Sequence, residues 1–181
     1  KLYKEIDKQI LDNGGHYELS PMYHNIILED ILDIYSFSMF YGFPIKPKMK
    51  HIILKMIDWS YSMSHPDGNV SFFNDSAIGI SSKTTELIEY AKQLGIIFFR
   101  EKKNIYDCDG YFVVKSHNWD VKFDACDIRA NNQPGHTHAD SLSFELSYYD
   151  LRFFVNSGTS TYHDMELRNQ QRSTMLHNTL A

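Results

Sequence analysis

The hydrophobic pattern of the chain changes its period near residue 65, and this change limits the folds that the chain can adopt. Before that point apolar residues recur every three to four positions, as on one face of a helix. After residue 96 they alternate with polar residues, as in strands. Helices followed by many strands indicate a multidomain α+β protein with antiparallel strands, rather than a sheet built from βαβ units.

Four helices are predicted, at residues 2–10, 20–41, 47–63 and 83–94. The first is followed by an Asn-Gly-Gly stop signal. The second begins with Ser20 as N-cap and a proline at the first helical position. Strands are predicted where apolar and polar residues alternate between turn signals, at residues 96–99, 111–115, 121–125, 141–147 and 151–155.

Composition excludes several classes of protein. With 43% hydrophobic and 23% charged residues among 181, the chain is typical of an ordinary globular protein. The net charge of −5 and the lack of a basic stripe argue against nucleic acid as a partner. No apolar run approaches the length of a membrane span. The chain has two cysteines, Cys108 and Cys126, which is too few to determine the redox compartment. Nothing in the sequence indicates an oligomeric state.

The most informative segment is residues 133–144, Gln-Pro-Gly-His-Thr-His-Ala-Asp-Ser-Leu-Ser-Phe. His136, His138 and Asp140 recur at every second residue, so in an unbroken strand they would share one face with the apolar Leu142 and Phe144. Imidazoles next to a core need partners, which indicates a site. Metal ligation and acid–base chemistry both remain open for these histidines.

Three further segments carry distinctive motifs. Residues 14–24 read Gly-Gly-His-Tyr-Glu-Leu-Ser-Pro-Met-Tyr-His, residues 155–162 read Val-Asn-Ser-Gly-Thr-Ser-Thr-Tyr, and residues 168–179 contain Arg168, Arg172-Ser-Thr and His177-Asn-Thr. With the 133–144 segment, their order resembles the heparinase II/III-like family of polysaccharide lyases, which includes heparinases II and III and oligoalginate lyases. The resemblance covers nearly the whole chain.

The resemblance implies an (α/α) toroid of helices followed by antiparallel sheets, with the active site between them. Residues 1–65 would be the end of the toroid, and residues 66–181 the start of an antiparallel β-sandwich domain. The chain is then expected to be a fragment of a larger bacterial protein, periplasmic or extracellular. The family residue that neutralises the substrate carboxylate would lie before Lys1.

The activity implied by the resemblance is β-elimination on an anionic, uronate-containing polysaccharide. A base removes the C5 proton, an acid protonates the departing O4, and the product carries a C4–C5 double bond. By the resemblance Tyr23 and His136 are the catalytic residues. A position in the first turn of a helix favours a phenolate at Tyr23. The alternative is that Tyr23 begins an apolar helical row and only packs.

Substrate-binding roles are predicted for two groups of residues. His16 and Glu18 lie in the loop before the tyrosine helix and are expected to line the same cleft. Arg129, Arg168 and Arg172 are the best candidates to bind a sugar carboxylate, because the guanidinium fork matches it. The alternatives are surface loop residues for the first group and structural ion pairs for the second.

The resemblance also implies zinc as a cofactor, with His138 and His177 as ligands. Asn156 stands where the family usually has an aspartate. An amide oxygen is a neutral and weaker zinc ligand than a carboxylate, so Asp140 or water is the alternative third ligand.

Three functions are therefore compared. The first is a polysaccharide lyase. The second is a carbohydrate-binding or surface-glycan biosynthesis-associated relative that has lost full activity. The third is a metal-dependent hydrolase built on His136, His138, Asp140 and His177. An unsaturated uronate product separates the first from both others.

Overall fold

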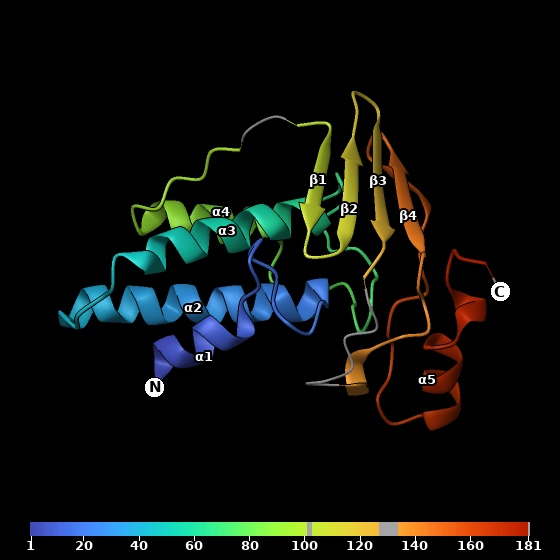
Figure 1. Cartoon of the computed structure of the whole chain (residues 1–181), viewed down its shortest axis with the longest axis horizontal. Helices are drawn as coiled ribbons and strands as arrows, with labels where there is room; N and C mark the ends of the chain where they lie inside the picture. The colour runs from blue at the N-terminus through green and yellow to red at the C-terminus, as the bar shows by residue number, and fades with distance from the viewer. Residues whose placement is uncertain (101–102, 127–133, 181) are drawn as a thin grey trace.

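A computed structural model of the chain describes residues 1–100, 103–126 and 134–180, and shows a helical part beside an antiparallel sheet (Figure 1). The helices are α1 Leu2–Gln9, α2 Pro21–Tyr41, α3 Lys48–Met63, α4 Thr84–Gln93 and α5 Met165–Gln171, with short 3-10 turns η1 Pro134–His136 and η2 Thr174–Leu176. The strands are β1 Ile105–Cys108, β2 Tyr111–Lys115, β3 Trp119–Asp124, β4 Phe144–Tyr148 and β5 Leu151–Phe154.

The four predicted helices are confirmed, within one or two residues at each end. Helix α2 starts where its capping signal places it, because the Ser20 hydroxyl accepts a hydrogen bond from the Tyr23 backbone N–H at 3.2 Å. It ends at Gly42, whose φ of 69° is the left-handed conformation that favours glycine. None of the described helices is long and apolar enough to cross a membrane.

Helices α2, α3 and α4 enclose one apolar core, formed by Leu28 and Ile31 of α2, Ile53 of α3 and Leu87 of α4. The strand predicted at residues 96–99 is wrong. Ile96 is buried in this same core, and the segment forms no strand. A short apolar run does not distinguish a strand from a stretch of extended chain that packs on helices.

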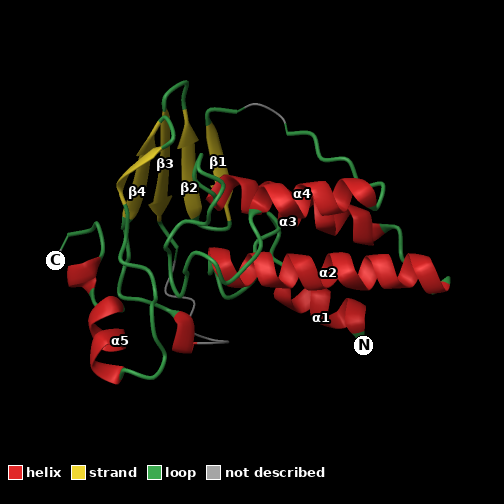
Figure 2. Ribbon diagram, turned by 180° about the vertical axis from the view of Figure 1, so that it is seen from behind, coloured by secondary structure: helices red, strands yellow, loops and turns green. Residues whose placement is uncertain are grey.

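The five strands form one sheet in the order β1-β2-β3-β4-β5, and every neighbouring pair is antiparallel. This confirms the predicted antiparallel pairing; β1 and α5 were not predicted. Seen from behind, the helical part lies on one side of the sheet and α5 lies beyond its lower end (Figure 2).

In β4 the two faces have the opposite character from the one predicted, because Glu145 and Ser147, and not Phe144 and Leu146, face the interior. On the inner face, Tyr111 and Val113 pack with Trp59 and Met63 of α3. The cross-strand register continues this face through buried polar residues, namely Asp120, Lys122, Asp124, Ser143, Glu145 and Ser147. The outer face exposes Phe112, Val114, Trp119, Phe123, Leu151 and Phe154.

The chain from His136 to Leu146 is not one unbroken strand, and the strand predicted at residues 141–147 starts three residues later. Strand β4 begins only at Phe144, and Leu142, with a φ of 63°, ends the preceding turn. His136 lies in η1, and His138 and Asp140 lie in the loop that follows it. The two-residue spacing of these side chains is therefore not the alternation of a strand, because the segment is a short turn followed by a loop.

Buried polar groups on the inner face are stabilised by pairing with one another. Lys122 and Lys115 both bind Asp120 at 2.7 Å. His65 binds Glu145 at 2.7 Å through one ring nitrogen and the Ser147 hydroxyl at 2.6 Å through the other. Such pairs offset the desolvation of the charges, which explains how a sheet can place polar residues in its interior.

His24 and His16 make the stability of the fold depend on pH. Burial lowers the pKa of His24 to about 3 and that of His16 to about 4. The His24 ring lies 4.3 Å from that of Trp59, with hydrogen bonds to the Met56 carbonyl and from the His16 backbone N–H. His24 thus packs in the interior between α2 and α3.

We expect His16 and His24 to lower the free energy of unfolding as the pH falls from 7 to 5. The unfolded chain protonates each ring below about pH 6.5, whereas the folded chain keeps both neutral, so the loss from each approaches about 1.4 kcal/mol per pH unit at the acid end of this window. Denaturant unfolding at pH 7, 6 and 5 measures the slope. His24→Gln, which cannot titrate, should give a smaller slope than the unmodified chain; equal slopes would contradict the assignment.

Candidate functional site

Tyr23 and His136 are in direct contact. Tyr23 comes from the first turn of α2 and His136 from η1, and their rings stack with centroids 4.5 Å apart and planes within 3°. The two predicted catalytic residues therefore meet where the helical part adjoins the loops below the sheet. The His136 side chain is 20% exposed, so a ligand can reach it.

Glu18, predicted to bind substrate, lies instead against His136. Its carboxylate accepts a hydrogen bond from His136 Nδ1 at 3.0 Å. A carboxylate at Nδ1 fixes the tautomer, leaves Nε2 free to accept a proton, and stabilises the imidazolium that results.

Tyr162 is a member of the site that sequence reasoning missed. Its hydroxyl lies 3.1 Å from the Tyr23 hydroxyl. Burial and the hydrogen bond with Tyr23 raise the pKa of Tyr162. The two hydroxyls therefore share one hydrogen bond, in which either oxygen can be the donor. The signal was present in the 155–162 motif, which ends at this tyrosine.

His16 lies close to the catalytic pair and is only 3% exposed, yet neither ring nitrogen has a hydrogen-bond partner in the described part of the chain. Its pKa is lowered by burial and also by the charge that His136 can carry. A neutral imidazole with two unused nitrogens can both donate and accept a hydrogen bond.

The arginines of α5 hold the loop around His136. Arg168 binds Asp75 with two hydrogen bonds, at 2.8 and 3.0 Å, and donates a third to the Gly135 carbonyl at 2.8 Å. Arg172 donates to the Thr137 carbonyl at 3.0 and 2.7 Å. The structure thus places both predicted substrate cations in contacts that fix the residues on either side of His136. Arg129 lies outside the described residues.

The tripeptide 74–76 joins the segments that carry the site. The Asn74 side chain donates to the Leu19 carbonyl at 3.1 Å and accepts from the His138 backbone N–H at 3.2 Å. The Asp75 backbone accepts from the Ser20 hydroxyl at 2.6 Å and donates to the His136 carbonyl at 3.2 Å. Only long-range contacts reveal this role.

His138 and His177 meet below the catalytic pair, with His138 Nδ1 and His177 Nε2 3.1 Å apart. The other nitrogen of His138 faces the Asp75 carboxylate at 2.9 Å, and that of His177 faces the Ser173 carbonyl at 2.7 Å. Both acceptors require an N–H. The two facing nitrogens are therefore lone pairs when both rings are neutral, and a cation or a shared proton between them relieves the repulsion.

Asp140 completes a set of three possible metal ligands. One ligand atom from each of His138, Asp140 and His177 lies within 4.8 Å of the others, and all three residues are buried. The buried Asp140 Oδ2 has no hydrogen-bond partner in the described residues. Tetrahedral zinc with bonds of about 2.0–2.1 Å separates its nitrogen ligands by about 3.3 Å, so the donor types and the 3.1 Å between the two histidine nitrogens are compatible with zinc.

Asn156 has a different set of contacts. Its Oδ1 accepts from the Asn178 N–H at 3.0 Å, and its Nδ2 donates to the Ser143 hydroxyl at 3.4 Å. It thereby ties the segment that carries His177 to the segment that carries Asp140. The geometry favours Asp140 over Asn156 as the third metal ligand.

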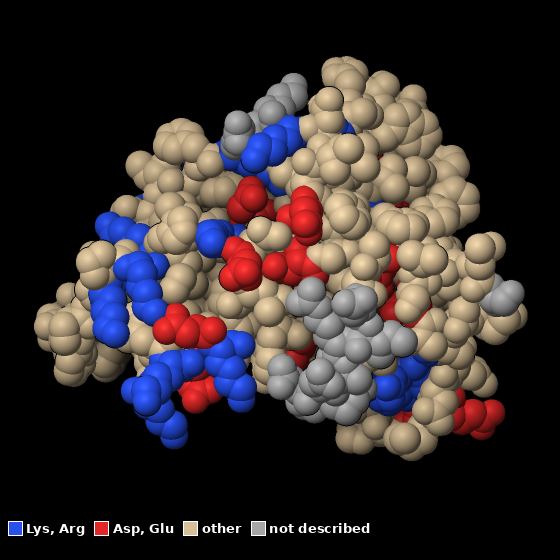
Figure 3. All heavy atoms as spheres, in the orientation of Figure 1, with Lys and Arg blue, Asp and Glu red and all other residues tan. Residues whose placement is uncertain are grey.

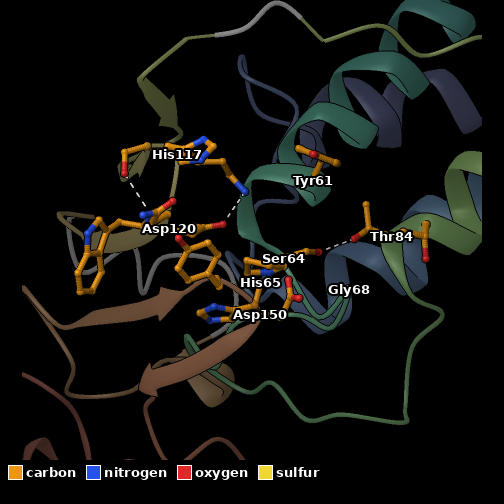
Figure 4. A pocket seen from close by; sticks show the side chains of 15 residues that line it. Tyr61, Ser64, His65, Gly68, Thr84, His117, Asp120 and Asp150 are labelled. Carbon is orange, nitrogen blue, oxygen red and sulfur yellow. Dashed lines mark hydrogen bonds and ion pairs between the residues drawn. The ribbon is translucent and has the colours of Figure 1, made fainter.

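A separate pocket lies at the other end of the sheet (Figure 4). It has a volume of about 410 Å³ and includes His65, His117, Asp120 and Asp150 among its lining residues. Among the residues that the structure describes, none of the predicted site residues lines it. On the face shown in Figure 3, lysines and arginines lie in separate groups next to acidic residues, without a continuous basic stripe.

The helices end against an antiparallel sheet, and a tyrosine and a histidine are in contact where the two parts meet. The lyases that the sequence resembles are expected to have this arrangement. The N-terminal model of heparinase II/III matches residues 1–106, and the C-terminal model of heparinase II/III-like proteins matches residues 100–181. The chain belongs to the heparinase II/III family.

Two similar proteins are heparin-sulfate lyases. That of Pedobacter heparinus is 26% identical over 99% of this chain, and that of Bacteroides stercoris is 24% identical over 98%. The chain spans about 30% of the length of each. The crystal structure of heparinase III superposes on this chain with a TM-score of 0.82 at 22% sequence identity. The match covers 99% of this chain and 34% of the heparinase III chain. A heparan sulfate lyase of Pedobacter heparinus matches 99% of this chain and 32% of its own with a TM-score of 0.78 at 23% identity.

We expect two substitutions to identify the third metal ligand. Asp140→Ala should lower zinc affinity by about 100-fold or more if Asp140 is a ligand, because a charged ligand is lost. Asn156→Asp should tighten zinc binding if position 156 reaches the metal. Competition with a chromophoric chelator measures both. Unchanged affinity in both variants would exclude both positions as the third ligand.

Proposed function

We propose that this chain carries catalytic residues of a polysaccharide lyase that cleaves an anionic, uronate-containing polysaccharide by β-elimination. The contact between Tyr23 and His136 carries the proposal. These side chains come from distant parts of the sequence and from different structural parts, and stacking brings both within reach of one sugar unit. β-Elimination requires such a pair, one group to accept a proton and one to donate it.

His136 is the better candidate for the base. Its Nδ1 is held by Glu18, so Nε2 can take the C5 proton, and the carboxylate stabilises the charge that develops on the ring. The electrons of the C5–H bond form the C4–C5 double bond as the C4–O4 bond breaks. The electron pair of that bond stays on O4, which must be protonated.

Tyr23 is the better candidate for the acid. In this proposal Tyr162 donates its proton to the Tyr23 oxygen, which lies 3.1 Å away, so the Tyr23 proton points elsewhere and is available to O4. After the transfer, the hydrogen bond from Tyr162 stabilises the Tyr23 phenolate. Exchange with solvent restores both catalytic groups.

His16, predicted to bind substrate, is less suited to that role than His136, because both of its ring nitrogens are buried and the residue is only 3% exposed. Burial lowers the pKa of His16 and keeps the ring uncharged at neutral pH. Heparin and heparan sulfate are the first substrates to test, because the similar proteins are named heparin-sulfate lyases.

Zinc at His138, Asp140 and His177 would supply a structural cross-link. The three side chains are buried, whereas a catalytic zinc needs a position that is open to substrate. This burial argues against the metal-dependent hydrolase. His138 is adjacent in sequence to Thr137, and its position helps to set the loop that carries His136.

The outer face of the sheet supports the proposal that the sheet belongs to a β-sandwich. An apolar face with Phe112, Trp119 and Phe154 exposed suits packing against a second sheet, as in a β-sandwich. The core shared by α2, α3 and α4 is compatible with helices of an (α/α) toroid.

We expect Tyr23→Phe and His136→Ala to remove most lyase activity from the full-length protein. Each deletes a proton-transfer group, which typically contributes about 10²–10⁴-fold. Ultraviolet absorbance of the unsaturated uronate measures turnover on heparan sulfate, hyaluronan and alginate. Phe37→Leu, in an exposed part of α2, is the control and should retain activity. Full activity in Tyr23→Phe would contradict the role of the hydroxyl.

Tyr162→Phe should lower kcat by about 10–100-fold, the cost of one hydrogen bond to a charged oxygen. Because the Tyr23 phenolate loses its donor, Tyr23 keeps its proton to higher pH and becomes a weaker acid. The alkaline limb of the kcat profile should therefore move to higher pH. A lower kcat with an unmoved limb would mean that Tyr162 acts on the substrate rather than on Tyr23.

A further inference from the structure

We propose that Asp75 is a positioning residue shared by the two halves of the site, because its one carboxylate orients both the metal-binding His138 and the arginine that holds the loop of His136. This inference rests on the proposed function for its catalytic half only. The half that concerns zinc stands on the histidine geometry alone.

The Asp75 carboxylate is fully buried and accepts four hydrogen bonds within the described residues. Oδ1 accepts from His138 Nε2 at 2.9 Å, from the Thr159 hydroxyl at 2.9 Å and from Arg168 Nη1 at 3.0 Å. Oδ2 accepts from Arg168 Nη2 at 2.8 Å. Four donors, two of them from one guanidinium, are the surroundings that favour an ionised carboxylate.

On the metal side, Asp75 decides which nitrogen of His138 is available. Because Nε2 must donate to the carboxylate, the lone pair of His138 lies on Nδ1, which faces His177. A carboxylate behind a ligating histidine fixes the tautomer and makes the ring a stronger ligand. Asp75 thus prepares His138 to bind a cation without touching the cation itself.

On the catalytic side, Asp75 acts through Arg168. The guanidinium that it binds also donates to the Gly135 carbonyl, the residue before His136. The same guanidinium lies over the Tyr162 ring at 4.4 Å, and the Tyr162 hydroxyl binds that of Tyr23. A displaced Arg168 would therefore disturb both the loop of His136 and the partner of Tyr23.

The test is Asp75→Asn in the full-length protein. The amide keeps the shape and one acceptor, but it removes the charge and turns a donor towards Arg168 or His138. We expect zinc affinity, measured by titrating the metal-free protein with Zn²⁺ against a chromophoric chelator, to fall about 10–100-fold. We also expect kcat to fall at least 10-fold while KM changes less than about threefold, because no substrate contact is removed.

Asp67→Asn is the matched control. Asp67 also binds an arginine, Arg152, with two hydrogen bonds of 2.9 and 3.0 Å, but it lies outside the site. This variant should keep both zinc affinity and kcat. Arg168→Gln separates the two halves, because it should lower kcat and leave zinc affinity within about threefold. If Asp75→Asn does not fold, Arg168→Gln serves as the test of the catalytic half in its place.

The outcomes distinguish this inference from the proposed function. If Asp75→Asn is folded and binds zinc as the unmodified protein does, Asp75 does not orient His138 and the inference is overturned. A protein that binds no zinc at all overturns it as well. If the unmodified protein cleaves no polysaccharide but Asp75→Asn still weakens zinc binding, the proposed function fails while the metal half of the inference holds.

Discussion

The site depends on one buried carboxylate, that of Asp75. Leaving a buried charge without its partners costs about 3–5 kcal/mol, so the segments that satisfy this charge cannot separate cheaply. The side chain binds His138 and Arg168, while the backbone binds the cap of the tyrosine helix at Ser20 and the carbonyl of His136. Correct folding of the helical part and the sheet part around Asp75 therefore brings Tyr23 to His136 as a consequence.

The same physical rule shapes the sheet. Its inner face carries charged and hydroxyl side chains, and each is tolerated because another buried group pairs with it, as His65 does with Glu145. Glu145 also accepts from the backbone N–H of Phe72 at 3.1 Å and of Asn156 at 2.9 Å. A single polar network thus extends from the sheet interior to the segments that hold the metal ligands. An apolar core could bury as much surface but would not fix these loops in one register.

Local sequence signals could predict only what local physics determines. The Ser20-Pro21 cap set the start of α2 correctly, because capping involves neighbouring residues. The alternation at residues 136–146 was misleading, because nothing local reveals that Glu145 has a buried histidine partner or that Leu142 turns the chain. The pairing of Tyr23 with His136 came from family resemblance and not from spacing. Arg168 and Asp75 are 93 residues apart in the sequence, so no helix or strand period could predict their ion pair.

The site divides into two levels with different tasks. Tyr23, His136, Glu18 and Tyr162 form a partly exposed level, which under the proposed function holds the proton acceptor and the proton donor. His138, His177, Asp140 and Asp75 form a buried level. Chemistry that needs substrate contact belongs to the first level, and the second is suited to holding the loop of His136 in place. A metal in the buried level would thus affect turnover only through geometry, and its loss should resemble a loosened loop rather than a missing catalytic group.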